Sequence, residues 1–242
     1  MYTVRPPFFL KWFYPNLIWN RERKDTKEKI VYLTFDDGPI PNVTDFVLNT
    51  LNSFGIKATF FCIGDNIQKH PQVFERIKNE GHAIGNHTYN HLKGWKTDDK
   101  TYVNNFWKCQ ELTGTNLFRP PYGRIKKSQI RQLVASYELP VTRNPQNTTY
   151  RSTLNSAQDL EHINSQPATR NSQLQIVMWD VLSGDFDINL SSEKCYQNVV
   201  KNTRNGSIIV FHDSLKAWDR LEYALPRAIE FLLKEGYGFK TL

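Results

Sequence analysis

The 242-residue sequence contains no run of about 18 apolar residues, so we expect no membrane-spanning helix. It also lacks the G-x-G-x-x-G and G-x-x-x-x-G-K-[ST] loops that bind dinucleotides and nucleoside triphosphates. No RNA- or DNA-binding motif is present, and we expect no nucleic-acid partner. The net charge of +7 is scattered, which leaves attraction to an anionic polymer such as cell wall as a weak alternative. A hydrophobic content of 39% and a charged content of 23% are typical of one globular domain.

Cysteine is also scarce. The three cysteines, Cys62, Cys109 and Cys195, are far apart and form no C-x-x-C pair. Cys62 lies inside an apolar segment that has the pattern of a strand. We therefore predict three buried, reduced thiols rather than a disulfide framework.

The first 20 residues are rich in aromatic side chains but are interrupted by Lys11 and Pro15. They contain no small-residue cleavage site, so we do not expect a signal peptide, and the compartment stays open, cytoplasmic or peripheral by default. We expect residues 1–29 to form an arm packed on the domain surface. The alternative is weak contact with a membrane surface, because Trp and Tyr favour the interfacial layer. We expect the protein to be a monomer.

Strand and helix patterns alternate along the rest of the chain. Apolar, strand-like segments occur at residues 30–35, 58–63, 82–86, 117–118, 175–179, 207–211 and 238–241. Helical patterns occur at residues 45–54, 71–79, 98–112, 126–134, 192–204 and 221–234. This alternation predicts a parallel sheet with helical crossovers. Either a β/α barrel or an open doubly wound sheet would place a functional site at the carboxyl ends of the strands.

One segment departs from this pattern. Residues 136–175 are about half Asn, Gln, Ser and Thr, and such a connection is long for a compact domain. We interpret it as a polar insertion within a catalytic domain of residues 30–242. Because it follows a helix and precedes a strand, we expect it at the face opposite the site, with His162 as a surface residue.

Two adjacent carboxylates, Asp36 and Asp37, end the first strand, and His87 and His91 follow the third. Imidazole nitrogen and carboxylate oxygen are ligands that zinc and similar ions accept. The histidines, spaced four residues apart, can face one way on a helical turn. With Asp37 they predict a metal site that keeps open positions for water and substrate.

The remaining polar residues at strand ends suggest an acid and a base. Asp36, left free beside the metal, can take a proton from water. His212 can donate a proton to the leaving group if a carboxylate such as Asp185 keeps it protonated. Arg119 can orient Asp36 through a bidentate contact. The turn that contains Tyr122 can direct its backbone N–H at a developing oxyanion.

The chain resembles the polysaccharide deacetylase family, carbohydrate esterase family 4, in five motifs that occur in the family's order. The motifs are Thr34-Phe35-Asp36-Asp37-Gly38-Pro39, His87-Thr88-Tyr89-Asn90-His91, Arg119-Pro120-Pro121-Tyr122-Gly123, Asp185-Phe186 and Val210-Phe211-His212-Asp213. The resemblance covers roughly residues 30–242 apart from the polar insertion. Phe186 and Val210 depart from the Trp and Leu usual in the family.

This resemblance implies a distorted (β/α) barrel of about seven parallel strands. It implies a divalent metal held by Asp37, His87 and His91, with Zn²⁺ as the default and Co²⁺ or Ni²⁺ as alternatives. It further implies hydrolysis of acetamides on an N-acetylated glycan, such as peptidoglycan or chitin, with Asp36 as base and His212 as acid. Two alternatives stay open, an O-acetyl esterase and a glycan-binding relative without catalysis.

Overall fold

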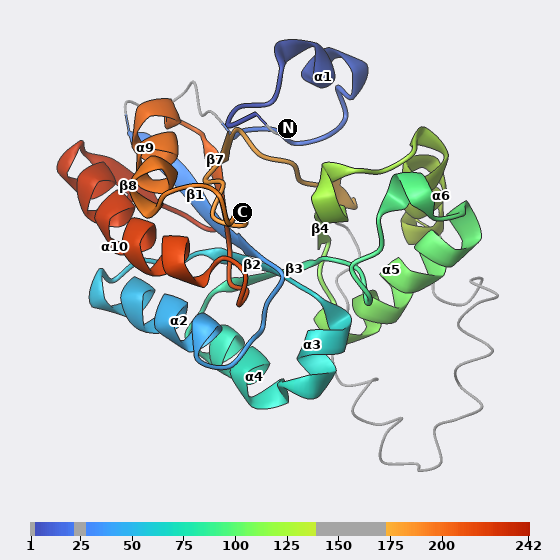
Figure 1. The fold of residues 1–242 in the computed structure, drawn as a ribbon. Coiled ribbons are helices and arrows are strands. Elements are labelled where there is room, and N and C mark those ends of the chain that lie inside the picture. Colours follow the sequence, from blue (N-terminus) through green and yellow to red (C-terminus); the bar gives the residue numbers. More distant parts are fainter. Residues whose placement is uncertain (1–2, 22–27, 139–172) are drawn as a thin grey trace.

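The chain folds around one curled sheet, which Figure 1 shows with its helices. The structure is a computed structural model, and it describes residues 3–21, 28–138 and 173–242. The strands are β1 (Lys29–Asp36), β2 (Thr59–Cys62), β3 (Ala83–Asn86), β4 (Leu117–Phe118), β5 (Gln175–Ile176), β6 (Val181–Leu182), β7 (Ile208–His212) and β8 (Tyr237–Phe239). Their order is β5-β4-β3-β2-β1-β7-β6, with β8 beside one end of β1, and the paired strands are parallel. The predicted distorted barrel of about seven parallel strands is confirmed.

Helices connect these strands and lie on the outer face of the sheet, apart from α1, which precedes β1 in the N-terminal segment (Figure 1). The helices are α1 (Phe8–Phe13), α2 (Val43–Ser53), α3 (Gly64–Lys69), α4 (Pro71–Asn79), α5 (Asp99–Thr113), α6 (Lys127–Glu138), α9 (Ser192–Asn202) and α10 (Trp218–Lys234). Local sequence sets their ends. The Asp98 side chain accepts a hydrogen bond from the Thr101 N–H and caps α5, and Gly114 ends that helix at a φ of 58°. Within the described ranges, no helix has both the length and the apolar composition to cross a membrane.

Three elements were absent from the prediction. The short helices α1 and α3 have six residues each, too few for a clear helical period. The segment predicted as one strand at residues 175–179 ends early, at Ile176. The chain then turns across the gap between the two ends of the sheet and forms β6, which is only two residues long.

The central strand β1 has one face toward the hydrophobic core and the other toward the candidate site. Phe35 lies between Phe60 and Phe211, with ring centroids 5.0 and 6.3 Å away, and packs with the helices outside the sheet. Because side chains alternate along a strand, Thr34 and Asp36 project from the opposite face, toward the inside of the curl. Because β1 is apolar on its outer face and polar on its inner face, the Asp36 side chain lies in the site.

The N-terminal segment lies between the two ends of the sheet. The backbone N–H of Ile18 donates to Ile176 in β5, and the Ile18 carbonyl accepts from Met178. Farther along the arm, the Val4 carbonyl accepts from the N–H of Leu182 in β6. This segment thus hydrogen-bonds to both edges of the sheet.

The three cysteines are buried and unpaired, as predicted. Most of the polar insertion expected at about 136–175 lies outside the described residues, as does His162.

Candidate active site

The carboxyl ends of the strands meet at one cavity of about 500 Å³. Asp36 is the last residue of β1, and it lies in register with His212, the last residue of β7. Six of the predicted site residues line the cavity: Asp36, Asp37, His87, His91, Tyr122 and His212. The other two, Arg119 and Asp185, are fully buried and contact the lining residues from behind.

Asp37, His87 and His91 form a cluster suited to a metal ion. The Asp37 Oδ1 atom lies 3.7 Å from His87 Nε2 and 3.2 Å from His91 Nε2, and the three ligand atoms are all within 4.8 Å of one another. Asp37 Oδ1 is buried and has no hydrogen-bond partner among the described residues. A buried carboxylate oxygen without a partner is costly, and a divalent cation between these three atoms would satisfy it.

Both histidines are held in the form that binds a metal. His87 Nδ1 lies 2.7 Å from the Arg119 carbonyl oxygen, so Nδ1 carries the proton that it donates there. Its Nε2 lone pair therefore faces Asp37. Burial lowers the pKa of His87 well below its ordinary value, and burial also lowers the pKa of His91. Neutral imidazole is the ligating form, and the environment of the pair favours it.

The prediction that the two histidines share a helical turn is wrong. Residues 87–91 form a loop in which Thr88 and His91 have left-handed backbone angles, with φ values of 62° and 55°. The Thr88 N–H donates to the Asn86 side chain, and the Thr88 hydroxyl accepts from the Leu92 N–H. These bonds hold a backbone shape that costs about 1–3 kcal/mol for each such residue.

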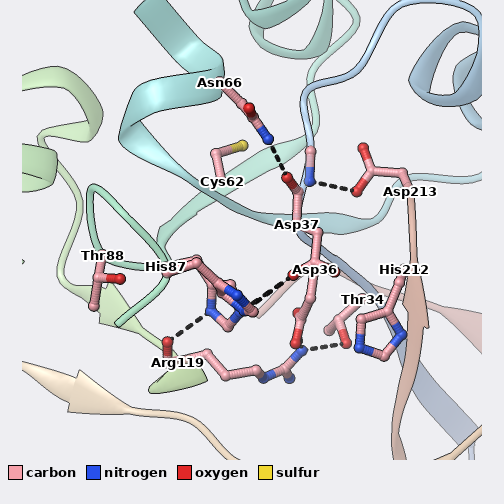
Figure 2. A network of polar contacts seen from close by, with 12 residues as sticks. Thr34, Asp36, Asp37, Cys62, Asn66, His87, Thr88, Arg119, His212 and Asp213 are labelled. Carbon is pink, nitrogen blue, oxygen red and sulfur yellow. Dashed lines mark hydrogen bonds and ion pairs between the residues drawn. The ribbon is translucent and has the colours of Figure 1, made fainter. Parts of the chain in front are cut away.

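Arg119 joins Asp36 to the rest of the site. Its Nη1 lies 2.6 Å from Asp36 Oδ1 and 2.8 Å from the Thr34 hydroxyl (Figure 2). The other guanidinium nitrogens donate to the carbonyls of Val177 and Met178. The predicted bidentate contact with Asp36 is therefore wrong, because one nitrogen alone reaches that carboxylate.

His212 has a different environment from the metal-site histidines. Its Nδ1 lies 2.7 Å from Asp185 Oδ1, and its backbone N–H donates to the other oxygen of the same carboxylate. Burial alone would lower the pKa of His212, but the charge and hydrogen bond of Asp185, together with the charges of Asp37 and Asp36, outweigh burial and raise the pKa to about 10. The imidazolium is therefore the stable form near neutral pH, as proton donation requires.

Asp213, the neighbour of His212, holds the loop that carries the carboxylate pair. Its side chain accepts from the Gly38 N–H at 3.0 Å (Figure 2). It also accepts from the Thr44 hydroxyl at 2.6 Å. A Cβ atom at Gly38 would lie 1.9 Å from Asp213 Oδ2, so only glycine fits there. Asn66 donates to the Asp37 carbonyl and fixes the same loop from α3.

The sequence predicts Tyr122 on the open side of the cavity but not most of the other residues there. Tyr122 is half exposed, with a φ of 59°, and its ring centroid lies 4.6 Å from that of His91. Additional lining comes from Trp179 and Leu182 and from three cations, Lys93, Arg124 and Lys216. Isolated residues in loops carry no periodic pattern, so only their arrangement in space identifies them.

Comparisons with known proteins place the chain among deacetylases of polysaccharides. The model of a family described as polysaccharide deacetylase matches residues 23–142. A peptidoglycan-N-acetylglucosamine deacetylase of Bacillus cereus is 42% identical over 223 residues, which cover 88% of this chain and 66% of that protein. The peptidoglycan-N-acetylmuramic acid deacetylase PdaA of Bacillus subtilis is 30% identical over 229 residues, covering 90% of this chain and 72% of that protein. A crystal structure of the Bc1960 peptidoglycan N-acetylglucosamine deacetylase has a TM-score of 0.74 and 29% identity, covering 98% of this chain and 95% of that one.

Metal content tests the three-residue cluster directly. We expect His87→Ala to lower the bound divalent metal at least tenfold, because two ligands cannot replace three. Asp36→Asn should retain the metal, because Asp36 pairs with Arg119 and lies outside the cluster. Mass spectrometry of the metal in both purified variants makes the comparison. Full metal content in His87→Ala would contradict the assignment.

Proposed function

The chain belongs to the polysaccharide deacetylase family, and on that premise we propose that it removes acetyl groups from the N-acetylated amino sugars of a glycan such as peptidoglycan. The observation that carries the proposal is the position of three functions around one cavity. The cavity is lined by the metal-ligand cluster, by the Asp36 carboxylate that Arg119 holds, and by His212, which Asp185 keeps protonated. Hydrolysis of an acetamide requires these three functions together.

The residues divide the reaction between two sides of the cavity. A divalent cation held by Asp37, His87 and His91 would lower the pKa of water and polarise the acetyl carbonyl. Asp36 takes a proton from the water that attacks the carbonyl carbon. The C–N bond then breaks, and His212 gives its Nε2 proton to the departing amine. The products are acetate and a free amino sugar, and the two proton transfers balance.

Two buried residues position these groups without touching substrate. Arg119 aims the Asp36 carboxylate into the cavity, and Asp185 fixes the ring of His212 so that Nε2 is the free, proton-donating nitrogen. We assign the backbone N–H of Tyr122 to the developing oxyanion, because this turn forms one wall of the cavity. Phe186 packs edge-on against His212, with ring centroids 5.2 Å apart, and narrows the same region.

Zn²⁺ is the metal that we propose, with Co²⁺ or Ni²⁺ as alternatives. Two imidazole nitrogens and one carboxylate oxygen match the ligand preference of zinc. Three protein ligands leave positions for water and for the carbonyl oxygen, which is the pattern of a catalytic rather than a structural site.

The same site geometry suits an esterase for O-acetylated sugars. Release of acetate from a panel of chitin oligomers, peptidoglycan and acetylated xylan separates the two activities. The rival without catalysis, a glycan-binding relative, predicts no acetate from any of them. The intact ligand cluster and acid–base pair favour the enzyme.

Replacement of the base gives the sharpest test of the mechanism. We expect Asp36→Asn to lower kcat at least about 10²–10⁴-fold, the range that a general base contributes, while metal content is unchanged. Asp219→Asn serves as the control, because that side chain is 80% exposed on α10. Acetate release at saturating substrate measures both. Near-normal turnover in Asp36→Asn would remove Asp36 from the role of base.

The protonated state of His212 predicts a pH dependence. Because Asp185 raises the pKa of His212 to about 10, proton donation is available below that pH and is lost above it. Asp185→Asn removes the charge that raises this pKa, so the alkaline limb of kcat/KM should move to lower pH, by about 1–3 pH units. Asp187→Asn on the same loop should leave the limb in place. An unmoved limb in Asp185→Asn would show that another group controls it.

We also propose two units along the chain, an arm of residues 1–29 and a catalytic domain of residues 30–242, acting as a monomer. The arm is proposed to touch a membrane surface through α1. Phe8 and Trp12 on that helix are 86% and 78% exposed, and Phe9 and Phe13 are also exposed. A cavity lined by Phe13 is also lined by Lys127 and Arg131 of α6, and these cations suit anionic headgroups.

Vesicle binding tests this contact. We expect co-sedimentation with vesicles containing anionic phospholipid and a several-fold loss in the double variant Phe8→Ser, Trp12→Ser. Ile188→Ser is the control, because Ile188 is 66% exposed but lies outside the arm. Equal sedimentation of all three proteins would contradict the proposal, and light scattering of the same samples reports the oligomeric state.

A further inference from the structure

A mostly apolar cavity of about 280 Å³ adjoins the catalytic cavity, between the N-terminal arm and the turn that follows β4. We infer, on the basis of the deacetylase function proposed above, that the acetylated amino sugar of the substrate is joined through phosphate to a lipid chain. The sugar lies in the catalytic cavity, the phosphate at the junction of the two cavities, and the chain in the apolar cavity.

The two cavities share part of their walls. Residues that line both are Tyr122, Gly123, Arg124, Trp179 and Leu182. A molecule that extends from the catalytic cavity across these residues enters the apolar cavity without crossing the core. Arg124 lies at this junction, and among the described residues that line the apolar cavity it is the one with a charged side chain.

Beyond the junction, the lining offers few partners for hydroxyl groups. Six of the residues there have side chains without a nitrogen or oxygen atom, namely Pro6, Pro7, Leu10, Leu17, Ile125 and Met178. The indole N–H groups of Trp19 and Trp95 already donate to backbone carbonyls, so their rings offer apolar surface. The hydroxyl groups of a sugar need polar partners when they leave water, whereas burial of a hydrocarbon chain is favourable. The apolar cavity therefore suits a lipid chain.

Three cations around the catalytic cavity favour an anionic substrate. Lys93, Arg124 and Lys216 line it, and within the described ranges none of them forms an ion pair with a carboxylate. The carboxylates of the site are matched by other groups, which are Arg119, the metal-ligand cluster and His212. A surplus of positive charge around a cavity attracts an anion to it.

The place and the chemistry of Arg124 suit a phosphate between the sugar and the chain. Its guanidinium lies 5.0 Å from the centre of the Trp95 ring, and this contact holds it along the wall of the apolar cavity. A guanidinium stacked on a ring keeps the N–H donors at its edge, and two of them can bind one phosphate in parallel. The single charged group of the junction is thus of the type that phosphate requires.

Helix α1 gives the lipid chain a route to a membrane. Leu10 lines the apolar cavity, whereas Phe8 and Trp12 on the same helix are 86% and 78% exposed. The helix projects beyond the other helices (Figure 1), and the Lys11 ammonium, 3.1 Å from the buried Asp180 carboxylate, fixes it there. Exposed aromatic rings favour the interfacial layer of a bilayer. A chain that leaves the cavity along α1 therefore enters the layer that these rings favour.

Three soluble probes separate the contributions of sugar, phosphate and chain. They are methyl N-acetylglucosaminide, the methyl diester of N-acetylglucosamine 1-phosphate, and the farnesyl diester of the same phosphate below the concentration at which it forms micelles. We expect kcat/KM for acetate release to rise about tenfold with the phosphate and about tenfold again with the chain. Equal values for the methyl and farnesyl diesters would overturn the inference.

Variants with matched controls assign each gain to a residue. Arg124→Gln should remove the gain from the phosphate and keep that from the chain, whereas Leu10→Ser should do the reverse. Leu10→Met keeps an apolar side chain and should retain both gains. The controls are Arg227→Gln, because Arg227 also packs over a ring, and Leu215→Ser, because Leu215 is 74% exposed; neither residue lines the apolar cavity. Both gains unchanged in Arg124→Gln and Leu10→Ser would contradict the assignment.

Calorimetry with the Asp36→Asn protein distinguishes failure of this inference from failure of the proposed function. That protein should bind the farnesyl diester about tenfold more tightly than the methyl diester. Absence of acetate from every probe and from chitin oligomers would overturn the deacetylase function, while the binding ratio still decides whether a lipid chain is recognised. Equal binding of the two diesters would overturn the lipid-linked substrate.

Discussion

The site depends on one fully buried cation, the guanidinium of Arg119. Removal of a charge from water is costly unless partners surround it, and loss of one partner of a buried pair costs about 3–5 kcal/mol. Here the partners are Asp36, Thr34, two backbone carbonyls and the face of Phe61, whose ring centre is 4.1 Å away. The carbonyl of the same residue fixes the proton of His87. One residue therefore holds the Asp36 carboxylate, the ring of His87 and the segment that follows β5.

Three histidines that line the same cavity differ in the form that their surroundings favour. Burial lowers the pKa of His87 and His91, whereas His212 has its pKa raised by a carboxylate that contacts both its ring and its backbone. The deciding difference is the geometry of the carboxylate. Asp185 is fully buried and bonded to one histidine alone, while the Asp37 oxygen is shared between two rings. The position of the nearest carboxylate thus decides which of these histidines has a raised pKa and which have lowered ones.

Most of the fold and the identity of the candidate site residues were predictable, for a physical reason. Strands such as β1 are short apolar runs, and in parallel sheets their carboxyl ends converge, so Asp36 and His212 were expected to meet. The rest depends on backbone conformations that side-chain patterns do not encode. The left-handed turns at Thr88 and His91 replaced the expected helical turn. The position of the N-terminal arm between the two edges of the sheet depends on contacts between residues more than 150 positions apart, such as Ile18 with Ile176.

The bond between Gly38 and Asp213 has a consequence for how the protein is made. It joins residues 175 positions apart, and the pairing of β1 with β7 spans a similar distance. Contacts of this range slow folding, because a long loop must close before they form. During synthesis the strand that carries His212, and Asp213 after it, is translated long after the carboxylate pair, because Gly38 and Asp213 are 175 positions apart. The arrangement of Asp36 beside His212 therefore forms only after β7 has been translated and has paired with β1.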